Sequence, residues 1–418
     1  MRLPSFVSKN IVVLSVVVLG IALFLPALWR GAFNADQSDF TTYYYATKGA
    51  LSLPLKHPYS NLAPLFPFFY PPGALVLFRP LNLLPYSAAV FVWTLVSFAA
   101  FVAGLYLLFK SLEKIGWGFS RGQQALIFLA LSLFYPLTFT ILAGQANAII
   151  FLCLVAAFYF YLREQDHLAG LSLAIGAVLK ISPALLLVYF LIKRRWKIFL
   201  WGVFFVALFS LGAEFAVQWD QSINWYYLRR VVHHTADQGG AYWRDQSLLS
   251  FLRLFQRFFD GLYSRIFESF LGSKLSGLRF YSLVNYALVG LATLPLLWSS
   301  FRSRSESRQS WRTLTEYSLF AILGVIGSGL CWYHQYTILI LPWVVALARV
   351  LKTELGTRRA TFLGILFSAF LAWAINWELL MFNRGYEPRF MTSIMFYGAA
   401  AVFGILFYLR RWGSRISS

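Results

Sequence analysis

The sequence predicts an all-α polytopic membrane protein, and three observations support this fold class. Hydrophobic residues make up 59% of the 418 residues and charged residues only 12%, against about 45–50% and about 25% in soluble globular proteins. The apolar residues form runs long enough to cross a bilayer, which needs roughly 20 residues. Aromatic residues reach 19%, and 36 Lys and Arg against 16 Asp and Glu leave a formal charge of +20. Such continuous apolar runs exclude a nucleic-acid-binding protein, so we attribute the positive charge first to membrane topology.

Apolar segments bounded by charged or turn residues predict the membrane spans in order along the chain. The first span follows Arg2 and Lys9 and ends without a small-residue cleavage pattern, so we expect a retained helix rather than a signal peptide. The expected spans are residues 10–29, 86–109, 123–142, 147–162, 198–217, 279–301, 313–332, 336–351, 360–380 and 390–410.

The apolar stretch 168–192 is interrupted by the polar sequence Lys180-Ile181-Ser182-Pro183. Each half is too short to cross a hydrocarbon core of about 30 Å at about 1.5 Å per residue. We therefore expect two short half-helices that enter the membrane and return. Together with the ten full spans they give about twelve transmembrane segments in a single domain, residues 1–418, with both termini on the cytoplasmic side.

Basic residues gather at the ends of alternate spans. More than half of the 36 Lys and Arg residues fall on the side that this topology makes cytoplasmic, as the positive-inside rule requires. The chain is therefore expected in the cell inner (plasma) membrane as a multi-pass protein. The sequence contains no convincing internal repeat, which disfavours an inverted-repeat transporter.

Two long loops, about residues 30–85 and 218–278, are expected on the outer side. Loops of this length are uncommon unless they are functional or disordered. Both are rich in Trp, Tyr, Phe and Leu, which argues against disorder. Residues 248–259 combine an apolar face with Arg253 and Arg257, a pattern typical of an interfacial helix. The outer face is therefore expected to carry the functional site.

Asp39 follows the first span, just ahead of a run of tyrosines. A carboxylate at the mouth of the membrane can accept a proton from a hydroxyl nucleophile. The structural alternative is that Ser38 or Asp39 caps a helix beginning at Phe40. Asp36 adds a second carboxylate, but two ligands make a weak site for a divalent cation, so no metal is expected.

Lys180 is the most informative basic residue. An ionisable group at membrane depth is energetically costly, so a functional role is the default hypothesis for it. The alternative is a snorkelling or structurally paired lysine. Gly144-Gln145-Ala146-Asn147 joins two spans at the outer face. These residues form either a simple tight turn or a turn in which Gln145 and Asn147 bind sugar hydroxyls.

The second outer loop contains Arg229, Arg230, His233, His234 and Arg244. Clustered cations among aromatic residues suit a phosphate at the membrane surface. The alternative is ordinary attraction to anionic head groups. The paired histidines lack a spaced carboxylate or cysteine, so a zinc site is not expected.

Two further segments lie at the expected outer face. The prolines of YPPG (70–73) and FRPLNLLP (78–85) favour a rigid structural elbow ahead of the second span. The WYHQY sequence (332–336) joins two later spans and places His334 where it can donate to a phosphate or pair with Asp39.

An ordered series of short motifs runs through residues 35–345. It comprises SDF followed by tyrosines, PY, YPPG, FRPLNLLP, GQAN, AGLSLAIGAVLKISP, KRRW, DQSLLSFL and WYHQY. The series resembles glycosyltransferase family 87, whose members have the GT-C fold and include polyprenyl-phosphate-mannose-dependent α-mannosyltransferases and related arabinofuranosyltransferases. The resemblance implies that Asp39 is the catalytic base, that Lys180 and His334 are polar positions of the site, and that no metal or other cofactor is needed.

The residues and the resemblance together predict a membrane glycosyltransferase, a hexosyltransferase of the cell envelope. It is expected to move a sugar, most readily mannose, from a polyprenyl-phosphate donor to a lipid or glycan acceptor at the outer face, and to act as a monomer. One well-placed carboxylate, Asp39, fits a single inverting displacement. Lys180, His334 and the loop cations are the candidates for stabilising the leaving phosphate. The alternatives are a transporter or flippase of lipid-linked sugars, and an O-antigen-type ligase or polymerase.

Overall fold

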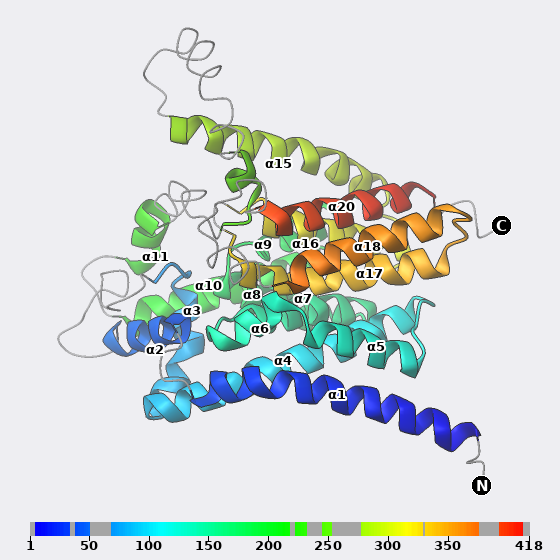
Figure 1. Cartoon of the computed structure of the whole chain (residues 1–418). Helices are drawn as coiled ribbons and strands as arrows, with labels where there is room; N and C mark the ends of the chain where they lie inside the picture. Colours follow the sequence, from blue (N-terminus) through cyan, green and yellow to red (C-terminus); the bar gives the residue numbers. More distant parts are fainter. Residues whose placement is uncertain are drawn as a thin grey trace.

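The structure is a computed structural model that describes residues 5–33, 38–50, 68–217, 222–231, 245–252, 277–328, 331–375 and 393–412. Within these ranges the chain forms helices joined by turns, and the only β-type pairing is an isolated bridge between Asp245 and Trp332. The predicted all-α class is therefore confirmed. Figure 1 shows α1 and α4 along one side of the bundle and α15 along the opposite side.

The first half of the bundle follows the predicted order of apolar segments. Its long elements are α1 (Ser5–Phe33), α4 (Tyr86–Lys114), α5 (Arg121–Ser132), α6 (Tyr135–Leu142), α7 (Asn147–Leu162), α8 (Asp166–Leu179), α9 (Ala184–Ile192) and α10 (Trp196–Ala216). Helix α7 packs between α4 and α8, and α8 packs in turn against α10.

The second half of the bundle begins after the second outer loop. Its elements are α15 (Gly277–Arg302), α16 (Trp311–Ile326), the 3-10 helix η4 (Tyr333–Leu339), α17 (Ile340–Lys352), α18 (Arg358–Ala374) and α20 (Ile394–Trp412). Helix α16 contacts α17 and α20, and η4 contacts both α6 and α7. The η4 segment therefore joins the two halves of the bundle.

Among the described residues, five helices are long and apolar enough to cross a membrane. They are Asn10–Phe33, Tyr86–Lys114, Trp196–Ala216, Val284–Arg302 and Tyr333–Lys352. The expected span at 123–142 consists of two helices, α5 and α6, which meet at a bend of 59°; as one broken span they would raise the number among the described residues to six. Pro136 lies in the first turn of α6, where it lacks the N–H that a continuous helix needs. The total of twelve segments stays a prediction.

The predicted half-helices at 168–192 are confirmed as two separate helices, α8 with 14 residues and α9 with 9. Lys180, between them, has an extended backbone (φ −161°, ψ 136°) that ends α8. The backbone of α8 comes very close to α10, since a Cβ atom on Gly170 would lie 2.7 Å from the amide nitrogen of Gly202. Small residues at such crossings are typical of helix packing in membranes.

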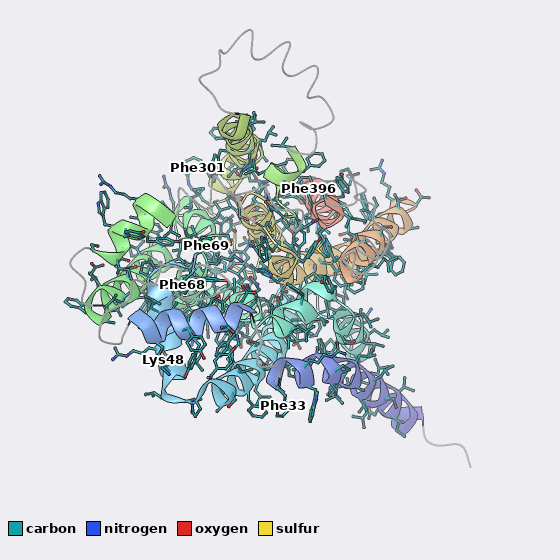
Figure 2. The ribbon with its side chains drawn as sticks, turned by 60° about the vertical axis from the view of Figure 1, so that its left-hand side comes forward. Phe33, Lys48, Phe68, Phe69, Phe301 and Phe396 are labelled. Atoms are coloured by element: carbon teal, nitrogen blue, oxygen red, sulfur yellow. The ribbon has the colours of Figure 1, made fainter. Side chains whose placement is uncertain are left out.

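Several short helices gather at one end of the bundle, while α1 begins and α20 ends at the other end (Figure 1). They are α2 (Ser38–Ala50), α3 (Gly73–Phe78), η1 (Arg79–Leu83), α11 (Ile223–Tyr226) and the π-helix η2 (Tyr227–Val231). Phe68 and Phe69 lie beside α2, which carries Lys48 (Figure 2). This end of the molecule holds the described residues of the first long loop, for which the outer side stays a prediction.

The proline-rich segment forms the predicted elbow. Pro72 precedes α3, and η1 then leads the chain into α4 at Tyr86. Gly73 allows α3 to lie close against the bundle, because a Cβ atom there would meet Val178 at 3.0 Å and Phe209 at 3.1 Å. The elbow thereby fixes the residues just before it, including Tyr70.

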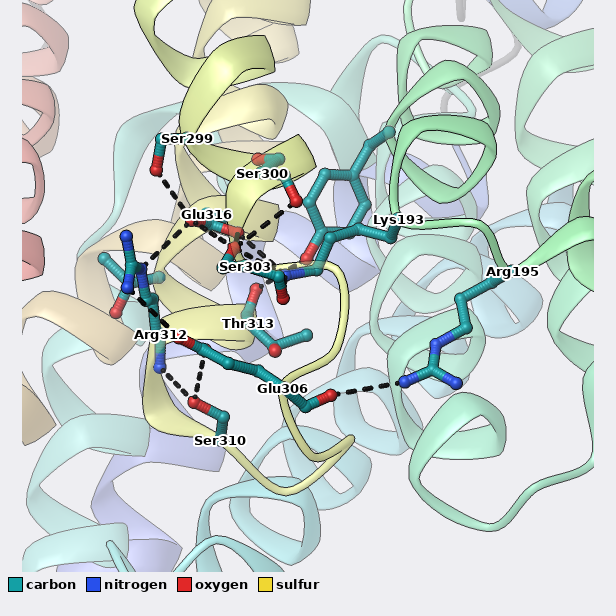
Figure 3. Close-up of polar contacts among 12 residues, drawn as sticks. Lys193, Arg195, Ser299, Ser300, Ser303, Glu306, Ser310, Arg312, Thr313 and Glu316 are labelled. Carbon is teal, nitrogen blue, oxygen red and sulfur yellow. Dashed lines mark hydrogen bonds and ion pairs between the residues drawn. The ribbon is translucent and has the colours of Figure 1, made fainter.

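A buried ion pair joins α9 to the α15–α16 hairpin (Figure 3). Lys193 Nζ lies 3.1 Å from Glu316 Oε2, and both side chains are almost completely buried. Ser303 accepts a hydrogen bond from Lys193 Nζ at 2.9 Å, and Ser299 donates one to Glu316 Oε1 at 3.1 Å. Arg312 Nε lies 3.4 Å from the same carboxylate. Buried charges of this kind are tolerated only when they are paired and hydrogen-bonded.

Candidate active site

Asp39 lies in the first turn of α2, which begins at Ser38 and so starts two residues earlier than expected. Its backbone N–H donates a hydrogen bond to the carbonyl oxygen of Ala143 at 3.1 Å. The start of α2 is therefore attached to the turn between α6 and α7. A carboxylate in the first turn of a helix is stabilised in its ionised form by the helix dipole.

Three polar side chains form a closed triangle beside Asp39. The hydroxyl oxygens of Tyr43 and Tyr70 lie 2.6 Å apart, and they lie 2.9 Å and 3.1 Å from Oε1 of Gln145. Burial, and then the nearby Asp39 carboxylate, raise the pKa of the Tyr70 hydroxyl above its usual range. Both contributions keep this hydroxyl protonated, so it serves as a hydrogen-bond donor rather than as a base.

Aromatic stacking holds α2 in this position. The ring of Tyr43 stacks on Phe78 with centroids 4.4 Å apart, and Phe40 stacks on Trp93 at 5.7 Å. Tyr44 donates a hydrogen bond to the carbonyl oxygen of Leu84 at 2.9 Å. The tyrosine run and the FRPLNLLP motif therefore cooperate to place the first turn of α2.

The GQAN motif is a tight turn that also contributes side chains to the site. Gly144 has a positive φ of 68°, a conformation that is costly for residues with a side chain. Its carbonyl oxygen accepts a hydrogen bond from Trp93 Nε1 at 2.7 Å. Gln145 and Asn147 are both buried, with exposed fractions of 3% and 1%. A tight turn and a binding role for Gln145 and Asn147 are therefore compatible with each other.

Lys180 reaches this turn from the break between α8 and α9. Its Nζ donates a hydrogen bond to Oδ1 of Asn147 at 3.5 Å, and Asp39 is a nearby carboxylate. The break itself packs against α16, where a Cβ atom on Gly324 would lie 3.1 Å from the carbonyl oxygen of Ser182. The predicted lysine is thus held between the carboxylate of α2 and the second half of the bundle.

His334 lies near Lys180, on η4. It is 3% exposed and interacts electrostatically with Lys180. Its ring lies parallel to that of Phe139, with centroids 6.0 Å apart, and its carbonyl oxygen accepts a hydrogen bond from Thr140 Oγ1 at 3.2 Å. The buried Nδ1 of His334 and the buried Nδ2 of Asn147 have no hydrogen-bond partner among the described residues. Buried polar atoms of this kind call for a partner from outside the chain.

The DQSLLSFL motif holds the segment that carries His334. Asp245 is fully buried, and its Oδ1 accepts hydrogen bonds from the amides of Ser247 and Cys331, each at 2.9 Å. The amide of Gln246 donates to the carbonyl oxygen of Cys331 at 2.6 Å, and the Tyr336 hydroxyl donates to the carbonyl oxygen of Gln246 at 2.7 Å. The DQSLLSFL and WYHQY motifs are both evident in the sequence, but no local pattern predicted the hydrogen bonds between their segments.

The predicted site residues therefore fall into three groups. Five of them are brought together, and they come from four separate parts of the chain: Asp39, Gln145, Asn147, Lys180 and His334. Arg229 is exposed, and its guanidinium lies 4.6 Å from the centroid of the Trp225 ring rather than against any of these five. The other predicted site residues are His233, His234 and Arg244. They lie outside the described residues, as does Asp36.

The described part of the chain holds no group of three or more His, Cys, Asp or Glu side chains placed to bind a metal ion. Asp39 has Lys180 nearby, and a cation beside a single carboxylate is unfavourable for a divalent metal. Metal independence stays a prediction, and it rests on these side chains being a poor set of metal ligands.

The model of glycosyltransferase family 87 matches residues 68–323, which is more than half of the chain. The chain belongs to glycosyltransferase family 87. The predicted family is thus confirmed. The match within family 87 includes Gln145, Asn147 and Lys180, whereas Asp39 precedes it and His334 follows it.

Three relatives carry names that describe mannosyltransferases. The polyprenol-phosphate-mannose-dependent alpha-(1-2)-phosphatidylinositol pentamannoside mannosyltransferase of Mycobacterium tuberculosis (strain CDC 1551 / Oshkosh) is 26% identical over 74% of this chain. The protein of the same name from Mycolicibacterium smegmatis is 32% identical over 33% of this chain. A polyprenol-phosphate-mannose-dependent alpha-(1-2)-phosphatidylinositol mannoside mannosyltransferase of M. tuberculosis (strain H37Rv) is 28% identical over 42% of it.

The matched segments span only part of these relatives, namely 65%, 33% and 42% of their lengths in the same order. Among solved structures, the family 87 chain is similar to ArnT from Cupriavidus metallidurans bound to undecaprenyl phosphate. That similarity covers 96% of this chain and 77% of ArnT, with a TM-score of 0.38 and 14% sequence identity.

Proposed function

We propose that this family 87 protein transfers a sugar, most readily mannose, from a polyprenyl-phosphate donor to a hydroxyl group of a lipid or glycan acceptor. The observation that carries the proposal is the convergence of Asp39, Lys180 and His334 from three separate elements. The names of the three relatives support the donor and the sugar. We also propose the GT-C architecture with twelve transmembrane segments, which family membership and the order of the helices support.

Asp39 is the general base in this proposal. Its carboxylate takes the proton of the acceptor hydroxyl as that oxygen attacks the anomeric carbon of the donor. The bond between the anomeric carbon and the phosphate oxygen breaks, and its electron pair leaves with the lipid phosphate. One displacement from the face opposite the leaving group inverts the anomeric configuration, and it needs no second carboxylate as a nucleophile.

Asp245 is the other carboxylate in this region, and its contacts argue for a different role. It is fully buried, and its Oδ1 already accepts two backbone N–H groups. Asp39 is partly exposed on α2. A base must reach the proton that it removes, so Asp39 is the better candidate.

The leaving phosphate is proposed to lie between Lys180, Asn147 and His334. It gains negative charge as its bond to the sugar breaks, so a nearby ammonium group stabilises the transition state more than the ground state. In the part of the chain that the structure describes, the buried Nδ1 of His334 and Nδ2 of Asn147 have no hydrogen-bond partner. Nδ2 of Asn147 is a hydrogen-bond donor and suits a phosphate oxygen or a sugar hydroxyl.

We propose that the site faces the outer side of the inner membrane. The short helices around Asp39 lie at the end of the bundle opposite the start of α1 and the end of α20 (Figure 1). The basic residues that follow the positive-inside rule are at that far end in the expected topology. Both observations support cytoplasmic termini and an outer active site.

The test uses purified protein in proteoliposomes with polyprenyl-phosphate mannose and candidate glycolipid acceptors. Mass spectrometry of the products measures transfer, and a lipid-accessibility assay measures movement of the donor across the bilayer. Asp39→Asn is expected to lower the rate of transfer by about 10²–10⁴-fold, the usual contribution of a general base. Glu113→Gln, at an exposed position paired with Lys110, is the control and keeps the wild-type rate.

The outcomes separate the proposal from its rivals. Transfer that survives Asp39→Asn undiminished removes Asp39 as the base. Movement of the donor without any transfer favours a flippase. Transfer from a polyprenyl pyrophosphate but not from a polyprenyl phosphate favours an O-antigen-type ligase or polymerase.

A further inference from the structure

Arg349 occupies an unusual position at the end of the bundle remote from Asp39. It lies in the last turn of α17, about 25 Å from His334 along η4 and α17 at the usual helical rises. Its guanidinium lies 3.9 Å from the ring centroid of Trp311 and 4.9 Å from that of Trp117. The two indole rings are themselves nearly parallel, at 22° with centroids 6.4 Å apart. Both indole rings therefore lie against the guanidinium, roughly at right angles to one another as seen from it rather than on its two opposite faces.

Two nitrogens on the edge of the same guanidinium have no partner among the described residues. Arg349 is 6% exposed, and its buried Nε and Nη2 make no hydrogen bond with any residue that the structure describes. One turn later on the chain, Thr353 is 3% exposed and its Oγ1 is also without a partner. Stacking on aromatic rings satisfies the faces of an arginine but not its in-plane N–H donors. Leaving such donors and a charge buried without an acceptor is costly.

The charged residues nearest in sequence do not supply a counterion. Lys352, Arg358 and Arg359 are all basic and exposed, and Glu354 is exposed as well. Glu113, at the end of α4, is paired with Lys110 at 2.9 Å. Within the described ranges no carboxylate forms an ion pair with Arg349. The missing negative charge must therefore come from outside these residues.

We propose that Arg349 and Thr353 form a binding site for a phosphate group, at the opposite end of the bundle from the candidate active site. The planar edge of an arginine matches two oxygens of a phosphate, and a threonine hydroxyl can donate to a third. Contacts with Trp117 and Trp311 limit the positions that the guanidinium can take. The phosphate belongs either to the head group of an anionic phospholipid or to a soluble phosphate compound.

This site is independent of the proposed transfer reaction. It lies at the end of α17 that η4 and His334 do not reach, and none of its residues contacts Asp39, Lys180 or His334. A phospholipid bound here would secure the ends of α4, α16 and α17 against one another. It would therefore stabilise the fold without taking part in the chemistry.

The chain supplies a matched control. Arg302 also lies in the last turn of a helix and also covers a tryptophan, with its guanidinium 4.9 Å from the ring centroid of Trp298. In contrast to Arg349, Arg302 is exposed. Arg302→Met removes a positive charge and an arginine–tryptophan contact, but not a buried, unpartnered guanidinium.

The experiment measures thermal unfolding in nanodiscs of phosphatidylcholine alone and of phosphatidylcholine mixed with phosphatidylglycerol. Native mass spectrometry of the same samples measures the affinity for phosphatidylglycerol. Separate arms add inorganic phosphate or glycerol 3-phosphate to the phosphatidylcholine discs. The variants are Arg349→Met, Arg349→Lys, Thr353→Val and Arg302→Met.

Phosphatidylglycerol is expected to raise the Tm of the wild type and of Arg302→Met, since a ligand that binds only the folded state stabilises it. Arg349→Met is expected to lose that increase and to bind phosphatidylglycerol at least about tenfold more weakly, the usual scale for a charged hydrogen bond. For Arg349→Lys and Thr353→Val, the increase in Tm and the affinity for phosphatidylglycerol are expected to lie between those of the wild type and of Arg349→Met.

An equal increase in Tm for Arg349→Met and the wild type would overturn the proposal. So would a higher Tm for Arg349→Met in every disc, because Arg349 would then be only a costly buried charge. An increase produced equally well by the soluble phosphates, and lost in Arg349→Met, supports the phosphate site and identifies its ligand as soluble. If Arg349→Met fails to fold, the comparison of Arg349→Lys and Thr353→Val with the wild type still decides the outcome.

Discussion

The backbone N–H of Asp39 donates a hydrogen bond to the carbonyl oxygen of Ala143 at 3.1 Å. This bond attaches α2 to the turn that presents Gln145 and Asn147. Lys180 reaches the same turn through Asn147. The carboxylate proposed as the base and the ammonium proposed to receive the phosphate are therefore both positioned by one short turn between α6 and α7.

The first prediction concerns Tyr43 and Tyr70, which share one acceptor atom. Replacing either with phenylalanine is expected to lower the unfolding free energy by about 1 kcal/mol, the usual net value of a hydrogen bond. The double variant should lose less than the sum of the two, with a coupling of at least about 0.5 kcal/mol. Denaturant titration in detergent micelles measures all four proteins, and losses that simply add would contradict the shared triangle.

The second prediction concerns the charge of Lys180. Lys180→Met is expected to lower the rate of transfer by about 10²–10³-fold, because the leaving phosphate loses its nearby cation. Lys180→Arg keeps the charge and should recover part of the rate. Lys197→Met removes an exposed lysine and serves as the control, with a rate close to that of the wild type. A kcat for Lys180→Met within threefold of wild type would exclude this role.

The third prediction separates Asp245 from Asp39. Asp245→Asn keeps an oxygen that can accept the amides of Ser247 and Cys331, so we expect activity within about tenfold of the wild type, well above that of Asp39→Asn. Asp245→Leu removes the acceptor and leaves two amides buried, which is expected to cost about 2–3 kcal/mol of stability. Initial rates and unfolding curves for the three variants provide the check. A rate for Asp245→Asn as low as that for Asp39→Asn would place Asp245 in the chemistry instead.

The fourth prediction concerns the buried pair of Lys193 and Glu316. Glu316→Leu leaves the lysine buried without its partner and is expected to destabilise the protein by about 3–5 kcal/mol. The double variant Lys193→Met/Glu316→Leu should recover most of this loss. Glu113→Gln breaks an exposed pair and should leave the stability nearly unchanged. A double variant as unstable as Glu316→Leu would mean that the loss comes from packing rather than from unpaired charge.

The fifth prediction concerns metal removal. Extensive treatment with a chelator is expected to leave the rate of transfer unchanged, because the site combines one carboxylate with a lysine rather than with further carboxylates. The assay compares untreated protein, chelated protein, and chelated protein supplied again with Mg²⁺ or Mn²⁺. A loss of activity that Mg²⁺ restores would require further ligands, and Asp36 would be the first to test.

Local sequence patterns predicted much of the fold. The break at Lys180 was predictable because a charge and a proline follow one another within an apolar stretch. The bend between α5 and α6 was missed although Pro136 marks it. Proline alone is not decisive, since Pro26 lies inside α1 and Pro295 inside α15. Packing against neighbouring helices decides which of these prolines ends a helix.

The sequence singled out residues of the candidate site but not their surroundings. Asp39, Lys180 and His334 were identified from residue type, position and family resemblance. The contact between Asp245 and Cys331 joins residues that lie 86 positions apart, and no local pattern predicts such a contact. No local pattern singles out Arg349, because its burial against two tryptophans depends on how α4, α16 and α17 pack.

The pair of Lys193 and Glu316 has a consequence for biosynthesis. The two residues are 123 positions apart, so at about 5–20 residues per second the ribosome adds the glutamate roughly 6–25 seconds after the lysine. Until then the ammonium group lacks the carboxylate that makes its burial tolerable. Helix α9 is therefore expected to settle into its final position only after the α15–α16 hairpin has been synthesised.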